Sequence, residues 1–253
     1  MTIDAPSRAH LPALRALWQE AFGDSDGFLN IFEKTAFSSD RCRCLFIEGV
    51  LVAALYWFDC SCRGERIAYL YAIATAKAYR GRGFCSALME NTHIHLWKLG
   101  YEGSILVPGT KELFEFYKKS GYRVCSYVRE LECKASCESL TLRQIDACEY
   151  GKLRRELLSD GDVVQENENL RFLQAQAELY TGEGFLLAAR RERETLFGIE
   201  LLGDIKKAPN ITRSLGCAEG HFRAPGADIP FAMYLPLGER MLTPPTYFGL
   251  AFD

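Results

Sequence analysis

IATAKAYRGRGFCSALM, residues 73–89, is the stretch that decides the fold of this sequence. It begins inside a run, Arg66–Thr75, that is almost continuously apolar or aromatic. Such a run is typical of a central strand that is buried on both faces. The glycines are followed by a helical pattern over about Phe84–Leu99, and Gly100 then ends it, as glycine commonly does. We therefore predict a strand, a glycine-containing turn and a helix in direct succession.

The turn itself, Arg80-Gly81-Arg82-Gly83, has the chemistry of an anion-binding site. The first four N–H groups of a helix have no acceptor within the helix, and the helix macrodipole adds positive potential there. Gly81 and Gly83 let an anion approach these amides without meeting a Cβ atom. Arg80 and Arg82 add positive charge, and Ser86 adds a hydroxyl in the first helical turn. These features predict a diphosphate site, although the spacing is neither a dinucleotide fingerprint nor a P-loop.

Two helices and a hairpin are expected before this stretch. Apolar residues recur at three- and four-residue spacings over residues 11–22, and a second helical stretch covers about residues 27–36. Two strands follow, Arg43–Glu48 and Val50–Asp59, joined by a tight turn at Glu48-Gly49.

A strand, a helix and a strand are expected after it. Ser104–Val107 is a short strand, and Thr110 is suited to cap a helix over Lys111–Ser120. Gly121 ends that helix, and Tyr122–Cys133 is a final strand. The whole order predicts an α/β domain with a mixed sheet and one parallel crossover unit.

The second half of the chain repeats the first half weakly. Leu196–Asp204 resembles Leu51–Asp59 at an offset of about 145 residues, and each reads as a strand that ends in Asp. At the same offset the Arg80–Gly83 turn falls on Pro225–Asp228, a Pro-Gly-rich segment that cannot open the same helix. Phe231–Leu235 reads as a buried strand.

Residues 73–89 resemble the acetyl-CoA motif of the GCN5-related N-acetyltransferases (GNAT). The family's pattern is Arg or Gln, two residues, Gly, one residue, then Gly or Ala. Arg80, Gly83 and Cys85 occupy the three defined positions, and Cys85 departs from the pattern while remaining small. A second match follows at Phe116-Tyr117, because the family has a helix that bears Phe-Tyr and ends in Gly plus an aromatic residue.

The resemblance implies two units. Residues 1–134 are expected to form a GNAT acetyl-CoA-binding catalytic domain with a mixed central sheet. Residues 138–253 are expected to form a smaller, degenerate α+β GNAT-like domain that lacks the CoA motif. The sequence is similar to the branch that includes the enhanced intracellular survival acetyltransferases.

The resemblance also implies roles for single residues. Tyr117 is expected to protonate the departing thiolate as general acid. His93 and His95 are expected to lie on the surface or to pack against the helix, since two residues apart they face different sides. The residues expected to bind acetyl-CoA, the co-substrate, are those at the strand end, in the turn and in the first helical turn: Ile73, Ala74, Thr75, Arg80, Gly81, Arg82, Gly83, Phe84, Cys85 and Ser86.

The leading functional hypothesis is direct transfer of an acetyl group to a primary amine of a small molecule. The general base is left open between Asp26, Asp59, Glu65, a water chain and the terminal carboxylate of Asp253, because relatives in this branch can use their chain terminus. A homodimer is compatible with the sequence.

Two alternatives stay open. One is a non-catalytic acyl-CoA-binding regulatory module, and the other is an aminoacyl- or peptide-forming transferase of tandem GNAT type. Acidic residues near the start of the second half favour a cationic acceptor or form a solvated face: Asp146, Asp160, Asp162, Glu166 and Glu168.

The composition restricts the expected cellular compartment and the expected binding partners of the protein. With 48% hydrophobic and 25% charged residues, the chain is an ordinary globular one. A formal net charge of −3 gives no general attraction to nucleic acid or anionic membranes, so neither is an expected partner. The opening residues carry no signal-like pattern, and the strand-like run Val50–Phe58 is far shorter than the about 20 residues that cross a bilayer. We expect a cytoplasmic protein with mostly reduced thiols.

The ten cysteines do not predict a metal site. Two Cys-x-Cys pairs are present, Cys42/Cys44 and Cys60/Cys62. The predicted hairpin places Cys44 near Ala54, so the two pairs do not meet.

Overall fold

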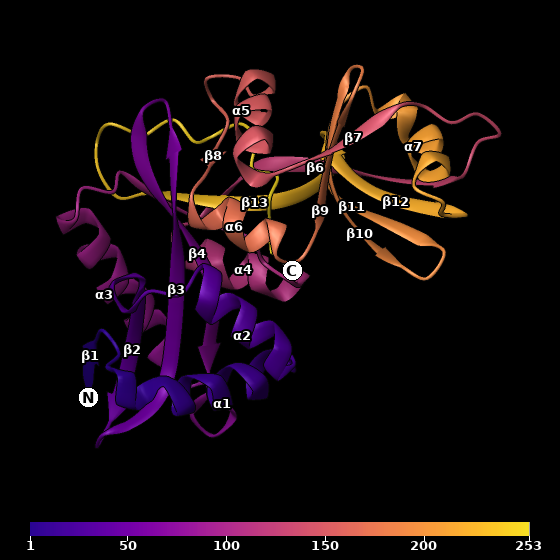
Figure 1. Cartoon of the computed structure of the whole chain (residues 1–253). Helices are drawn as coiled ribbons and strands as arrows, with labels where there is room; N and C mark the ends of the chain where they lie inside the picture. Colours follow the sequence, from indigo (N-terminus) through magenta and orange to yellow (C-terminus); the bar gives the residue numbers. More distant parts are fainter. Residues whose placement is uncertain (253) are drawn as a thin grey trace.

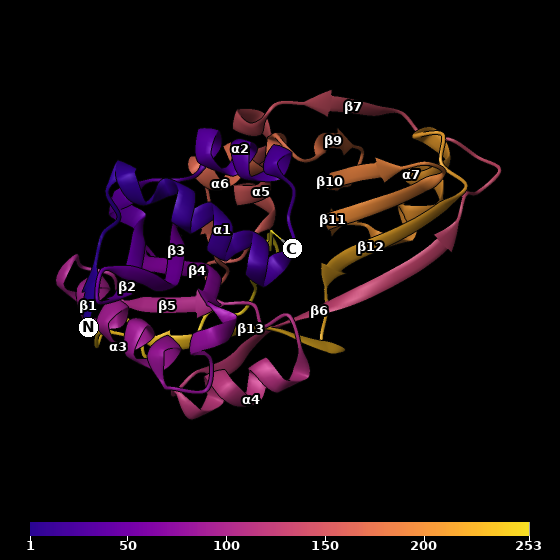
Figure 2. The same ribbon diagram turned by 90° about the horizontal axis from the view of Figure 1, so that it is seen from below.

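The first lobe of the computed structural model, which describes residues 1–252, is a sheet between two pairs of helices (Figures 1 and 2). Its strands follow the order β1-β2-β3-β4-β5-β13-β6, and only the β4/β5 pair in this lobe is parallel. Helices α1 and α2 cover one face, and α3 and α4 cover the other. The bounds are β1 Thr2–Asp4, α1 Leu11–Phe22, α2 Asp26–Thr35, β2 Cys42–Ile47, β3 Val50–Cys62, β4 Glu65–Thr75, α3 Phe84–Lys98, β5 Gly103–Leu106, α4 Lys111–Lys119, β6 Arg123–Lys134 and β13 Ile229–Pro236.

Local sequence sets most of these boundaries. Gly23 adopts a left-handed conformation and ends α1, and the Ser25 hydroxyl accepts a hydrogen bond from an amide in the first turn of α2. Thr110 caps α4 in the same way, as predicted. The β2–β3 hairpin turns at Glu48-Gly49 with Cys44 opposite Ala54, so the predicted register is confirmed.

The strand β13 comes from the end of the chain and lies inside the first lobe. It pairs antiparallel with β5 through Met233 and Leu106, and antiparallel with β6 through Met233 and Val124. Its buried strand pattern was predicted, but its place in this sheet was not. The division of the chain into domains at residues 1–134 and 138–253 stays a prediction. In the structure the two parts share one continuous sheet.

The second lobe extends the same sheet beyond β6, as Figure 2 shows. Its order is β6-β12-β11-β10-β9-β7, and β11–α7–β12 is a parallel crossover unit. Pro225 ends β12, and the chain turns directly into β13, so no helix opens at Pro225–Asp228. The bounds of the remaining elements are β7 Leu142–Ile145, α5 Ala147–Leu157, β8 Val164–Gln165, α6 Glu168–Gln174, β9 Glu178–Gly182, β10 Phe185–Glu192, β11 Thr195–Gly203, α7 Ala208–Ser214 and β12 Glu219–Pro225. Of these, β8 lies outside the second lobe's strand order and pairs antiparallel with β3. No helix within residues 1–252 has the length and apolar character to cross a membrane.

A buried carboxylate joins the end of the chain to the second lobe. Glu200 is fully buried and accepts hydrogen bonds from Arg154 at 2.7 and 2.9 Å, from Tyr150 at 2.9 Å and from Tyr247 at 3.0 Å. Gly249 lies against it, because a Cβ there would stand 1.9 Å from Glu200 Oε1. Both charges of the buried Arg154–Glu200 ion pair therefore have hydrogen-bond partners, as buried charges require.

Replacing Glu200 with Gln is expected to lower the free energy of unfolding by about 3 kcal/mol, because it leaves the Arg154 charge buried without its counter-charge. Urea unfolding followed by circular dichroism measures the change. Glu149→Gln is the matched control, since the Arg143–Glu149 pair is exposed and such pairs add little stability. Equal midpoints for both variants would contradict the assigned importance of Glu200.

Candidate active site

The parallel strands β4 and β5 pair over only three residues. The pairs are Ile67/Gly103, Ala68/Ser104 and Tyr69/Ile105, after which β5 ends at Leu106 while β4 continues to Thr75. The edge of β4 beyond Tyr69 therefore has no pairing with β5. Unpaired backbone N–H and C=O groups on a strand edge can accept an extended ligand as an added strand.

The backbone of β4 is irregular in this segment. Ala72 has a positive φ of 47°, which is uncommon for a residue with a side chain. The register with β3 shifts between the pairs Ala54/Ala74 and Tyr56/Tyr71. Such a bulge bends a strand and re-aims its groups, and bulges are common next to binding sites.

The predicted turn follows the end of β4 and opens α3. Gly81 and Gly83 have φ values of 74° and 80°, and Gly83 is the N-cap of α3. A Cβ on either glycine would meet no protein atom within 4 Å. Glycine suits these two positions because it adopts the left-handed conformation without strain. The space in front of both residues is open.

The first amides of α3 face that open space. The first bond of the helix runs from the Ala87 N–H to the Gly83 carbonyl at 3.0 Å. The N–H groups of Phe84, Cys85 and Ser86 precede it and therefore have no acceptor within the helix. Ser86 is exposed, and Phe84 and Cys85 are half-buried. The start of α3 therefore offers three amides without an acceptor in the helix, and the binding of an anion there stays a prediction.

Polar side chains surround this turn. Arg80 and Arg82 are exposed, Arg80 Nε donates to the Thr75 carbonyl at 2.9 Å, and the Arg82 guanidinium lies 5.4 Å from the Tyr79 ring centroid. Thr75 Oγ1 is buried beside the Cys85 thiol, whose pKa it lowers, and has no well-aligned hydrogen bond within residues 1–252. It is therefore available to a ligand lying along β4.

Tyr117 lies on α4 and shares one apolar core with the turn. Its side chain is 6% exposed, and Ile73, Phe84 and Cys85 pack against the same core. Burial, with a contribution from Cys85, raises the pKa of Tyr117 well above its usual range. Burial also raises the pKa of the Cys85 thiol to about 11. Both groups therefore hold their protons at neutral pH.

The sequence-based reading missed a polar chain next to Tyr117. His93 Nε2 lies 2.8 Å from the Tyr122 hydroxyl, which lies 2.7 Å from Ser104 Oγ. His93 does pack within the fold, as expected, but it does so by a direct hydrogen bond. The available signal was Tyr122 itself, because a tyrosine buried after a helix cap needs a partner for its hydroxyl.

Three of the four carboxylates considered as general bases, Asp26, Asp59 and Glu65, lie beside arginines. Asp26 pairs with Arg15 at 2.8 Å, which lowers the pKa of Asp26. Glu65 lies 3.3 Å from Arg240, at the far end of β4 from Thr75. Asp253 lies outside the described residues, so its terminal carboxylate stays a prediction.

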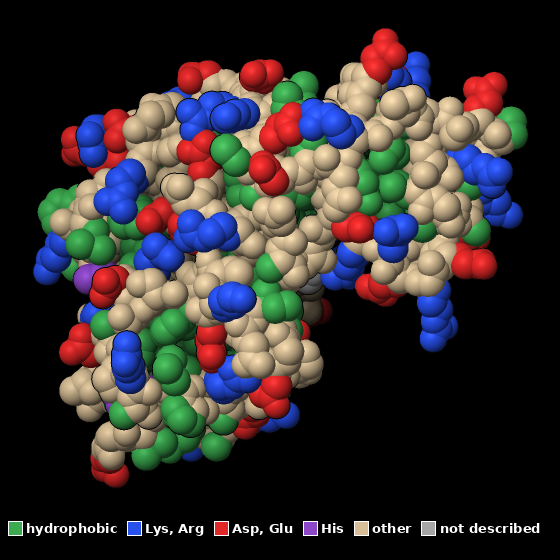
Figure 3. Space-filling model, viewed as in Figure 1, with side chains coloured by type: hydrophobic (Ala, Val, Ile, Leu, Met, Phe, Trp, Pro, Cys, Tyr) green, Lys and Arg blue, Asp and Glu red, His purple; other side chains and the backbone are tan. Residues whose placement is uncertain are grey.

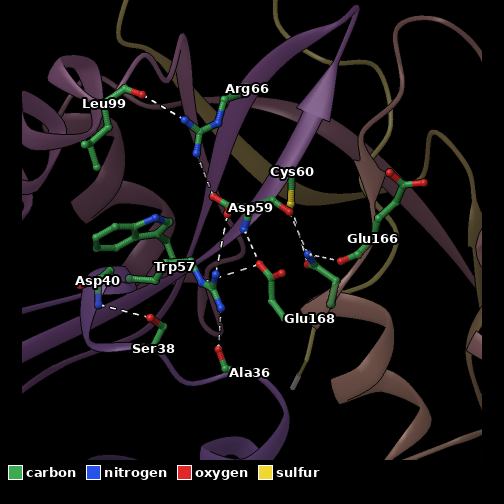
Figure 4. A network of polar contacts seen from close by, with 12 residues as sticks. Ala36, Ser38, Asp40, Trp57, Asp59, Cys60, Arg66, Leu99, Glu166 and Glu168 are labelled. Carbon is green, nitrogen blue, oxygen red and sulfur yellow. Dashed lines mark hydrogen bonds and ion pairs between the residues drawn. The ribbon is translucent and has the colours of Figure 1, made fainter.

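Asp59 belongs to a polar network between the lobes, shown in Figure 4. Its carboxylate lies 3.5 Å from Arg66 and 3.8 Å from Arg41, and its N–H donates to Glu168 at 2.9 Å. Asp59 pairs with Ala68, which lies about 16 Å along β4 from the predicted pantetheine-binding residue Ile73 at 3.3 Å per residue. The contacts indicate a structural role.

The acidic residues that open the second lobe also have partners. Asp146 caps α5, and Glu166 pairs with Arg155. Asp162 accepts hydrogen bonds from the Thr246 hydroxyl and the Ser159 amide, both at 2.7 Å. These contacts favour the structural interpretation over attraction of a cationic acceptor.

The end of the chain reaches the other face of β4. Phe252 is buried with its ring centroid 6.1 Å from that of Tyr69 and 6.2 Å from that of Tyr71. Gln165 fixes this segment through two hydrogen bonds to the Leu250 backbone, at 2.7 and 3.2 Å. The last described residues, up to Phe252, thus lie against β4 and the second lobe.

A family model described as an acetyltransferase (GNAT) domain matches residues 2–125. Residues 2–125 form a GNAT acetyltransferase domain. The family makes the chain an acyltransferase. A search of the curated proteins gives no match.

Solved structures share the fold of this GNAT chain over nearly its whole length. The GCN5-related N-acetyltransferase from Anabaena variabilis has a TM-score of 0.74 at 16% identity, covering 94% of this chain and 73% of that one. The one from Kribbella flavida has a TM-score of 0.71 at 17% identity, covering 92% and 70%. Eis1 from Mycobacterium abscessus has a TM-score of 0.65 at 13% identity, covering 94% and 74%. The resemblance to the enhanced intracellular survival branch is confirmed in the fold.

Charged side chains of both signs and free cysteines are spread over the protein. Lysine, arginine and acidic side chains are interspersed over the face in Figure 3. All ten cysteines are free, and Cys42 and Cys44 lie with their sulfurs 3.8 Å apart in the core. Within residues 1–252 no three His, Cys, Asp or Glu side chains are gathered as metal ligands would be.

Lowering the pH is expected to destabilise this protein partly through His93. Burial lowers the pKa of His93 to about 4, whereas an unfolded chain gives a His pKa of about 6.5. Between these values the unfolded state binds a proton that the folded state does not, so stability is fully present above pH 6.5 and falls towards pH 4. We expect His93 to account for about 1 kcal/mol of the loss between pH 7 and pH 5 after allowance for its partial exposure. Urea midpoints for wild type and His93→Gln at both pH values measure it, and equal pH dependence would contradict it.

Proposed function

We propose that the GNAT domain transfers an acetyl group from acetyl-CoA directly to a primary amine of a small molecule. The observation that carries the proposal is the set of open amides at the start of α3 beside the unpaired edge of β4. The amides suit a diphosphate, and the strand edge suits the amide-containing pantetheine arm. Both lie in the segment that the family model matches.

Each predicted donor-binding residue has a task in this proposal. The backbone of Ile73, Ala74 and Thr75 would pair with the pantetheine arm, and the Thr75 hydroxyl would gain a well-aligned hydrogen-bond partner. The first-turn amides of Phe84, Cys85 and Ser86 would bind the pyrophosphate between the exposed side chains of Arg80 and Arg82. Gly81 and Gly83 would leave the approach clear.

Tyr117 would act as general acid. The amine nitrogen forms a bond to the carbonyl carbon and loses a proton to a base or to water, the carbon–sulfur bond breaks, and the sulfur leaves as a thiolate. The thiolate takes the proton of the Tyr117 hydroxyl, and a proton from water then restores the phenol. A phenol kept protonated by burial meets the first requirement for this role.

Arg80→Ala is expected to weaken acetyl-CoA binding about tenfold, because a charge-assisted hydrogen bond to phosphate contributes about 1.5–3 kcal/mol. Gly83→Val is expected to weaken it at least as much by placing a branched side chain before the amides. Isothermal titration calorimetry with acetyl-CoA measures both. Arg213→Ala, an exposed arginine at the end of α7, is the control, and no measurable affinity for any CoA species in the wild type would remove the proposal.

Tyr117→Phe is expected to lower kcat about 10²-fold with an unchanged KM for acetyl-CoA, because it removes a general acid and leaves the ring in place. Thiol release measured over a panel of primary amines, including spermidine, tyramine, glucosamine and lysine, gives the rates. Unchanged turnover would dismiss Tyr117 as the acid. CoA binding without turnover of any amine would favour a regulatory module.

A further inference from the structure

The reaction described above does not use the buried polar chain beside Tyr117. The Tyr122 hydroxyl lies 2.8 Å from His93 Nε2 and 2.7 Å from Ser104 Oγ. Tyr122 and Ser104 are fully buried. The three residues come from the segment between α4 and β6, from α3 and from β5, so one hydroxyl joins three elements that surround the site.

The Tyr122 hydroxyl can donate one hydrogen bond and accept another within this polar chain. Ser104 can donate to Tyr122, and Tyr122 can donate to Nε2 of a neutral His93. Burial lowers the pKa of His93 to about 4, so the imidazole is neutral at neutral pH and its Nε2 lone pair is available as an acceptor. A buried network whose members are all satisfied holds its residues rigidly.

Tyr122 is connected to Tyr117 by backbone and by ring. The Tyr122 N–H donates to the Tyr117 carbonyl at 3.1 Å, and the Gly121 N–H donates to Lys118 at 3.0 Å, with φ of 92° at Gly121. This is a Schellman cap, in which an apolar contact between the two side chains is usual. The two rings meet edge to face, with centroids 5.9 Å apart. Phenylalanine would provide that contact, so the hydroxyl of Tyr122 serves another purpose.

Ser104 connects the chain to the point where the strands separate. It pairs with Ala68, and the next pair, Tyr69/Ile105, is the last between β4 and β5. The polar chain of His93, Tyr122 and Ser104 therefore links α4, which carries Tyr117, to the start of the unpaired edge of β4. The acetyl donor is proposed to lie on that edge.

We propose that His93, Tyr122 and Ser104 are positioning residues that fix Tyr117 relative to the parting of β4 and β5. The hydrogen bonds hold the ring of Tyr122, and the ring of Tyr122 limits the movement of the Tyr117 phenol. The inference rests on the proposed function, in which that phenol is the general acid. Catalysis depends steeply on such placement, since a displacement of about 1 Å can cost 10²-fold in rate.

The kinetic test compares variants that differ only in hydrogen bonding. Tyr122→Phe removes the central hydroxyl of the polar chain, and His93→Leu removes one end of it. His93→Gln has nearly the size of Leu and keeps polar atoms for Tyr122. We expect kcat to fall about tenfold in the first two, with an unchanged KM for acetyl-CoA, and to stay near wild type in His93→Gln. Tyr101→Phe is the control, because the Tyr101 hydroxyl is equally a buried hydrogen-bonding group, with Trp57 and Asp59 as partners.

A second readout needs no acceptor amine. With 3-fluorotyrosine at position 117, we expect one narrow fluorine resonance in the wild type and in Tyr101→Phe. Tyr122→Phe and His93→Leu are expected to broaden or split it, because the ring gains alternative positions. A loss of stability alone would not change this signal below the unfolding transition.

The outcomes separate the two proposals. Unchanged turnover in Tyr117→Phe overturns the role of Tyr117 as general acid. The fluorine spectra then test on their own whether Tyr122 restrains the ring of Tyr117. Reduced turnover in Tyr117→Phe, with unchanged kcat and narrow resonances in Tyr122→Phe and His93→Leu, overturns the restraint and leaves the acid role intact. Equal loss of kcat in His93→Leu and His93→Gln also overturns it.

Discussion

The insertion of β13 between β5 and β6 is the constraint on which the rest of the structure depends. Without it, β5 and β6 would each present an unpaired edge in the middle of the sheet, and buried backbone groups need partners. The same strand leads to the last described residues, which lie against β4 and the second lobe. A lobe that resembles a self-sufficient domain in sequence is therefore completed by residues from the other end of the chain.

The segment after β13 extends this dependence to the face of β4 that lies opposite the Tyr117 core. Tyr247 is fixed by Glu200 in the second lobe, Phe248 exchanges hydrogen bonds with Ser126, and Leu250 is bound by Gln165. These contacts bring the Phe252 ring beside the β4 tyrosines. The second lobe thus holds residues 247–252 beside this face of β4.

The sequence predicted what is encoded locally. The β2–β3 register, the caps of α1 and α4 and the strand–turn–helix at residues 73–89 follow from turn chemistry and periodicity, and the structure agrees with them. It did not predict the location of β13, because the continuous apolar run Phe231–Leu235 identifies a buried strand without identifying the strands beside it. The His93–Tyr122 bond was missed for the same reason, since the two residues are distant in sequence and only the fold brings them together.

The position of β13 also has a consequence for biosynthesis. A ribosome that has completed β5 adds about 120 more residues before β13 begins, which takes on the order of ten seconds at usual rates of translation. During that interval the nascent first lobe exposes strand edges that attract other chains. The part of the enzyme that is translated first consequently completes its sheet only after β13 has been made.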